Sequence, residues 1–104
     1  MKVNGVGPDA PTITNDRGGS QSHVPYRMDL VDGPAILRMA AVLAEGAERY
    51  GAENWRQIEV RDHLNHLIVH AYAWLAGDRS DDHLSHAMCR AMFAAAVAQA
   101  EEAP

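Results

Sequence analysis

The chain has 104 residues, 47% of them hydrophobic, and a formal net charge of −5. This length allows one domain with a single modest core. The acidic balance argues against a protein that follows a nucleic-acid backbone, because such a protein displaces counterions with a basic stripe. No apolar run approaches the roughly 20 residues that span a bilayer, and the first residues carry no apolar signal segment. We therefore expect a cytoplasmic protein whose partners are neither membranes nor nucleic acids.

The composition predicts helices. Alanine is abundant, glycine and proline concentrate outside the middle of the chain, and no β-branched run alternates with polar residues. We expect an all-α protein without a sheet, a small antiparallel bundle of about three helices in residues 35–104 preceded by an irregular arm in residues 1–34. Because so alanine-rich a bundle buries little surface, we also expect it to be oligomeric, as a homodimer or homotetramer.

The arm is rich in glycine, proline, asparagine, aspartate and serine and shows no helical period. Its segment Gly18-Gly19-Ser20-Gln21-Ser22 is similar to a phosphate-wrapping loop, although a flexible linker fits the same composition. Arg27 follows, and its planar guanidinium either grips a phosphate or pairs with Asp29.

The first helix is predicted from about Ala35 to Tyr50. Residues 32–34, Asp-Gly-Pro, supply a capping carboxylate and a first-turn proline, and Gly51 supplies a left-handed stop. At about 100° per residue, Glu48 falls near the edge of the apolar stripe and Glu45 falls further round. Glu48 is therefore expected to reach a neighbouring helix more easily than Glu45. The alternative is that both glutamates belong to a solvated acidic face.

The second helix is predicted to open at Asn54, where Asn54 and Gln57 form a variant of the capping box, and to end at Gly77. One side of this helix is apolar and contains Val60, Leu64, Leu67, Ile68, Ala71 and Leu75. The opposite side carries acids and imidazoles at intervals of three and four: Glu59, Asp62, His63, His66 and His70. That polar stripe is either a solvated face or part of a ligand site.

The third helix is predicted to begin after Ser80, a hydroxyl cap followed by two aspartates where the helix dipole favours acids. Its polar side holds Asp82, His83, His86 and Arg90. In an up-and-down bundle, the end of the first helix meets the start of the second, and the start of the third lies beside His70.

Carboxylates on facing helices suit a hard divalent cation, Mg²⁺ or Mn²⁺, which takes oxygen ligands and binds substrate phosphates. Such an ion stabilises charge on a pyrophosphate and activates the attacking water. Two alternatives stay open: a metal phosphohydrolase built on the histidine pairs, and a non-catalytic helical interaction module whose acids and histidines are solvated.

Several blocks of the sequence resemble the dATP/dGTP diphosphohydrolases of phages and bacteria, relatives of the MazG-like all-α nucleotide pyrophosphatases. The order and spacing of the blocks across residues 18–93 carry the resemblance. The blocks are Gly18-Gly19-x-Gln21-Ser22, Tyr26-Arg27-Met28-Asp29-Leu30, residues 45–51 with Asn54-Trp55, His70 and residues 77–87. The resemblance implies metal-dependent hydrolysis of a purine deoxynucleoside triphosphate, dGTP or dATP, to the monophosphate and pyrophosphate. It places the protein in the host cytoplasm if it is phage-encoded.

The resemblance also implies residue roles. MazG-like enzymes hold their ions with a Glu-x-x-Glu pair on one helix and a Glu-x-x-Asp pair on the next. Glu45 and Glu48 match the first pair, and the second is either Glu59 with Asp62 or a set from Asp78, Asp81 and Asp82. The catalytic candidates are Glu45, Glu48 and Asp82. The substrate-binding candidates are Gly19, Gln21, Arg27, Asn54, Trp55, His70, His86 and Arg90.

The chain departs from the family pattern at two informative positions. Ser20 stands where the family often carries lysine, and Arg90 stands where it carries asparagine. Without that lysine, the assignment of phosphate binding to the arm is weaker. Arg90 either replaces the missing charge or marks a changed base preference.

Overall fold

The structure is a computed structural model that describes residues 2–103. Its internal contacts divide the chain into two units, Met1–Asp32 and Gly33–Pro104. The predicted boundary lay at residue 34, and the difference arises because the first helix already begins at Gly33.

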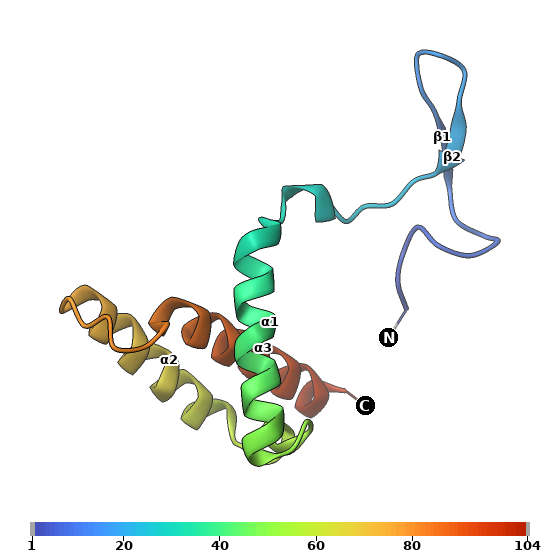
Figure 1. Cartoon of the computed structure of the whole chain (residues 1–104). Helices are drawn as coiled ribbons and strands as arrows, with labels where there is room; N and C mark the ends of the chain where they lie inside the picture. Colours follow the sequence, from blue (N-terminus) through green and yellow to red (C-terminus); the bar gives the residue numbers. More distant parts are fainter. Residues whose placement is uncertain (1, 104) are drawn as a thin grey trace. The chain divides into compact units, whose positions relative to one another are not determined.

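The N-terminal unit contains a two-stranded antiparallel sheet, so the expectation of a chain without strands was wrong. Its strands are β1 (Thr12–Thr14) and β2 (Ser20–Ser22), and the 3-10 helix η1 (Met28–Leu30) follows (Figure 1). Ile13 pairs with Gln21 across the sheet. Asn15 closes the turn, because its side-chain oxygen accepts hydrogen bonds from the backbone N–H groups of Arg17 and Gly19. The short β-branched run Thr-Ile-Thr before an asparagine turn is a hairpin signal.

The C-terminal unit is helical, as predicted. It consists of α1 (Gly33–Tyr50), the 3-10 helix η2 (Asn54–Gln57), α2 (Val60–Leu75) and α3 (His83–Glu102). Helices α2 and α3 run antiparallel as a hairpin, and α1 crosses α3 (Figure 1). Among the residues described, α1 therefore finds its main partner in α3, and not in the start of α2 as expected. None of the helices described is long and apolar enough to cross a membrane.

Two helix starts differ from the prediction. Asn54 opens only a 3-10 turn, because the backbone becomes extended at Ile58, and α2 begins after its N-cap, Glu59. The N-cap of α3 is Asp82, whose side chain accepts a hydrogen bond from the Ser85 backbone N–H at 3.3 Å. Three residues of capping type, Ser80, Asp81 and Asp82, precede the helix, and the one nearest to it is used.

The helical unit buries polar side chains and leaves an apolar stripe exposed. His63 is fully buried, His83 and Ser85 are nearly so, and the small residues Cys89 and Ala94 complete the set of buried side chains described. The stripe expected to form the core side of the second helix is only partly covered. Val60, Leu67 and Ala71 are half-buried, whereas the exposed fractions are 43% for Leu64, 49% for Ile68 and 71% for Leu75. The histidine-bearing side of α2 packs against α3, where His70 lies against His83 and His63 accepts a hydrogen bond from Arg90.

Candidate functional site

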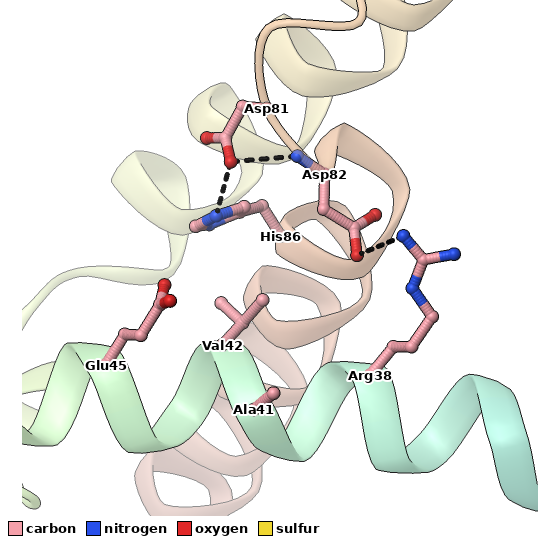
Figure 2. A pocket seen from close by; sticks show the side chains of 7 residues that line it. All are labelled: Arg38, Ala41, Val42, Glu45, Asp81, Asp82 and His86. Atoms are coloured by element: carbon pink, nitrogen blue, oxygen red, sulfur yellow. Dashed lines mark hydrogen bonds and ion pairs between the residues drawn. The ribbon is translucent and has the colours of Figure 1, made fainter.

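A pocket of about 200 Å³ lies between α1 and the start of α3 (Figure 2). Helix α1 contributes Arg38, Val42 and Glu45, which are spaced by four and three residues and so project from one face of the helix. The other wall consists of Asp81 in the loop before α3, Asp82 as its N-cap and His86 in its first turn. Acidic, basic and imidazole side chains from two helices thus meet around one small cavity.

Asp81 and His86 form the acid–imidazole pair of this pocket. His86 Nε2 lies 3.3 Å from Asp81 Oδ1, and the same oxygen accepts a hydrogen bond from the Asp82 backbone N–H at 2.8 Å. The carboxylate therefore fixes one ring nitrogen of His86 as a donor. Glu45 extends from α1 on the same side of the pocket (Figure 2).

Asp82 has both carboxylate oxygens engaged. Oδ1 caps α3, and Oδ2 pairs with Arg38 Nη2 at 3.1 Å. Hydrogen bonding from Ser85, followed by the nearby guanidinium of Arg38, lowers the pKa of Asp82, although desolvation opposes the shift. Asp82 is therefore a charged residue that caps α3 and pairs with Arg38 in this structure, and the catalytic role that the resemblance implies for it stays a prediction.

Three histidines gather beside the pocket. His70 Nδ1 lies 3.0 Å from His83 Nδ1, and the ring of His70 stacks on that of His86 with 4.9 Å between centroids. His83 Nε2 lies 3.2 Å from Asp78 Oδ2, although it has no partner with hydrogen-bond geometry in the described chain. We assign the proton of His83 to Nε2, facing the carboxylate, so that His70 Nδ1 donates to His83 Nδ1. Burial, followed by the neighbouring imidazoles, lowers the pKa of His70.

The predicted contact between the third helix and His70 is thus confirmed. His70 lies against two other histidines, and its expected contact with substrate stays a prediction.

A second histidine site holds η2 against the helical hairpin. His63 Nε2 lies 2.9 Å from the carbonyl oxygen of Trp55, and Arg90 Nη1 lies 3.1 Å from His63 Nδ1. Because a carbonyl only accepts, Nε2 carries the proton and Nδ1 accepts from Arg90. The Trp55 ring stacks on Phe93 with 4.7 Å between centroids. Trp55 and Arg90, both predicted substrate contacts, therefore have internal partners in this conformation.

The other predicted site residues lie apart from this pocket. The acids Glu48, Glu59 and Asp62 are exposed and line neither of the two pockets described. Glu45, and not Glu48, is the residue of α1 that faces α3. Asn54 is exposed in η2.

The candidate contacts of the arm belong to the N-terminal unit. Gly19 lies in the hairpin turn and Gln21 lies in β2. Arg27 pairs with Asp29 through two hydrogen bonds of 2.9 and 2.8 Å, which is the second of the two alternatives that the sequence left open.

The positions of the carboxylate and imidazole side chains show whether a metal ion could be held in this pocket. Within residues 2–103, no group of three or more histidine, cysteine, aspartate or glutamate side chains is placed to hold an ion. Glu45, Asp81 and His86 share a pocket, but Asp81 already binds His86. The residues as placed do not form a ready Mg²⁺ or Mn²⁺ site, and the predicted ligand set stays a prediction.

Arg38 is a site residue that sequence reasoning missed. It lines the pocket and pairs with Asp82, although its side chain is 72% exposed. The available signal was its position seven residues before Glu45, which places both side chains on one face of α1.

The family of the chain follows from comparison with known proteins. Residues 15–103 match the family model described as dATP/dGTP diphosphohydrolase, N-terminal. No curated protein and no solved structure matches the chain. The match covers most of the chain, including every block on which the resemblance rested and all residues of the pocket between α1 and α3. The chain therefore belongs to the dATP/dGTP diphosphohydrolase family.

Proposed function

We propose that this protein hydrolyses a purine deoxynucleoside triphosphate, dGTP or dATP, to the monophosphate and pyrophosphate. The family supports the reaction class. The observation that carries the proposal is the pocket in which Glu45 of α1 faces Asp81 and His86 at the start of α3.

The side chains of the pocket match the needs of this reaction. Hydrolysis of a phosphoanhydride requires that the attacking water lose a proton and that the charge on the departing pyrophosphate be stabilised. Glu45 and His86 are the two groups able to accept the proton, and Asp81 orients the His86 ring through Nε2. Arg38 supplies positive charge at the edge of the pocket.

We also propose that the reaction requires Mg²⁺ or Mn²⁺. The support is the resemblance, together with the acid-rich pocket. A bound ion would supply charge neutralisation for the phosphates. Among residues 2–103, the side chains do not form an ion site in this conformation.

Product analysis tests the reaction. The purified chain is incubated with dGTP or dATP, with Mn²⁺, with Mg²⁺ or with EDTA, and the nucleotides and pyrophosphate are quantified. We expect equal amounts of the monophosphate and pyrophosphate in the presence of either ion and none with EDTA. Release of inorganic phosphate as the first product, or no turnover of any purine deoxynucleoside triphosphate, would contradict the proposal.

We further propose that copies of the chain associate through the exposed apolar side of α2. Leu64, Ile68, Tyr72 and Leu75 are spaced by three and four residues, and each is at least 43% exposed. A contiguous apolar stripe of this kind marks an interaction site in soluble proteins. Light scattering coupled to size exclusion should show a dimer or tetramer for the wild type and a smaller species for Ile68→Glu. A wild-type monomer at micromolar concentration would contradict this proposal and leave the catalytic one untouched.

A further inference from the structure

A second pocket, of about 600 Å³, adjoins the first and shares Arg38, Asp81 and Asp82 with it. Its remaining wall comes from the end of α2 and the loop before α3, and it includes Trp74, Arg79 and the buried His83. This volume falls within the range of about 300–1,000 Å³ that is typical of small-molecule sites. Asp81 and Asp82 on its wall are metal-ligand candidates from the sequence, but neither the sequence motifs nor the family match assign a role to Arg79, to Trp74 or to the cavity as a whole.

Arg79 is fixed in place at this pocket. Its Nη1 donates hydrogen bonds to the carbonyl oxygens of Trp74 at 2.8 Å and Asp78 at 2.9 Å. Its guanidinium carbon lies 4.4 Å from the centre of the Trp74 ring, in cation–π contact. A guanidinium held by both backbone and indole loses little conformational freedom when it binds a ligand.

Arg79 is also the cation of this pocket that lacks a carboxylate partner within the described chain. Asp82 pairs with Arg38 at 3.1 Å, and Asp81 lies 3.3 Å from His86. No ion pair involves Arg79 among residues 2–103. The pocket therefore presents one fixed positive charge to a ligand, and a second arginine, Arg38, stands at its border with the first pocket.

We propose that this second pocket binds the pyrophosphate portion of the substrate, with Arg79 as its fixed ligand and Arg38 as the contact nearer to the reacting phosphorus. The inference rests on the proposed function. A planar guanidinium donates two parallel hydrogen bonds to phosphate oxygens, and this places charge where the leaving group becomes more negative. Arg79 already covers one face of Trp74, which favours a phosphate over a stacked base at this position.

Binding of inorganic pyrophosphate to the full chain, measured by calorimetry, tests the site. The loss of charge-assisted hydrogen bonds in Arg79→Ala should raise the Kd for pyrophosphate about tenfold or more. The Kd of Arg79→Lys should lie between those of Arg79→Ala and the wild type. Arg61→Ala is the matched control, because Arg61 is exposed on α2 and lines neither pocket. Its Kd should stay within about twofold of the wild-type value, as for a surface charge.

A second variant is needed because replacing Arg79 could unfold the loop before α3. Arg79 contacts two carbonyl groups, so Arg79→Ala is checked by thermal unfolding, and Arg38→Ala, whose side chain is 72% exposed, serves as the independent test. We expect Arg38→Ala to weaken pyrophosphate binding severalfold. Unchanged binding in folded Arg79→Ala would overturn the inference, and if Arg79→Ala does not fold, unchanged binding in Arg38→Ala would overturn it.

The inference and the proposed function fail in distinguishable ways. If the wild type hydrolyses dGTP while pyrophosphate binding is the same in Arg79→Ala and Arg61→Ala, the second pocket is wrong and the reaction stands. If pyrophosphate binds in an Arg79-dependent way and no deoxynucleotide is hydrolysed, the second pocket stands and the reaction is wrong.

Discussion

The α2–α3 hairpin holds histidines at two places, and the two sites differ in exposure and in hydrogen-bond partners. His63 is 0% exposed and has both ring nitrogens engaged, one on the Trp55 carbonyl and one on Arg90. His86 has a side chain that is 29% exposed, faces Asp81 and borders a pocket. An imidazole can exchange a proton with a substrate only where a ligand can reach it. Because of its exposure and its partners, we propose His86, and not His63, as the histidine that takes part in the reaction.

The largest expected effect follows from removing the accessible imidazole. Because a positioned general base contributes about 10²–10⁴-fold to a rate, His86→Asn should lower kcat for dGTP by at least about 100-fold, with a smaller change in KM. His66→Asn is the control, since His66 is exposed on α2 and lines neither pocket. Equal rates for the two variants would remove the functional distinction drawn between the histidines.

The next largest effect is expected at His63, where a substitution should lower the free energy of unfolding. His63→Ala leaves the Arg90 guanidinium, which is partly buried, and the Trp55 carbonyl without their partner. Breaking a buried charged network costs about 3 kcal/mol or more in unfolding free energy. Urea unfolding measures this cost. If His63→Ala lowered the free energy of unfolding by less than His66→Asn does, the hydrogen bonds of His63 would not anchor η2.

Asp82 should give a smaller effect. If it is a cap, as the hydrogen bond from Ser85 indicates, Asp82→Ala lowers the unfolding free energy by about 1 kcal/mol and Asp82→Asn costs less, because asparagine also caps. The two variants are compared by denaturant unfolding at neutral pH. The same loss in both would indicate that the pairing with Arg38, and not the cap, stabilises the start of α3.

The smallest effect is a pH dependence of stability. Burial lowers the pKa of His70 below the ordinary histidine value of 6.5, and partial desolvation, followed by the charge of Arg90, lowers the pKa of the largely exposed His66. The unfolded chain therefore binds more protons than the folded one, and stability falls as pH drops below about 6.5. Urea unfolding at pH 7 and pH 5 should show this loss, and His70→Asn should reduce it. The carboxylates with lowered pKa, such as Asp82, add their own loss only at lower pH.

The sequence predicted local structure better than contacts between elements. The start of α1 at Asp32-Gly33-Pro34 and its end before Gly51 were readable because caps and stops act over a few residues. The β1–β2 hairpin was missed because its strands have three residues each, too few to show alternation.

The candidate site was predicted only in part, because it also depends on contacts between elements. Helical spacing showed that His63 and His70 share one side of α2, but spacing cannot say which neighbour that side meets. The partner of Glu45 is α3, which depends on how α1 crosses the hairpin. Arg38 and Glu45 lie on the same face of α1, and only their shared pocket with Asp81 makes that face the candidate site.

The central claim is that the pocket between α1 and α3 is the site of reaction, and Glu45 tests it most directly. We compare kcat/KM for dGTP in Glu45→Gln and Glu48→Gln, two isosteric changes one helical turn apart on α1. The account predicts a loss of at least about 100-fold for Glu45→Gln and a loss below about tenfold for Glu48→Gln, which lines neither pocket. A Glu45→Gln protein that hydrolyses dGTP as fast as the wild type would contradict the account.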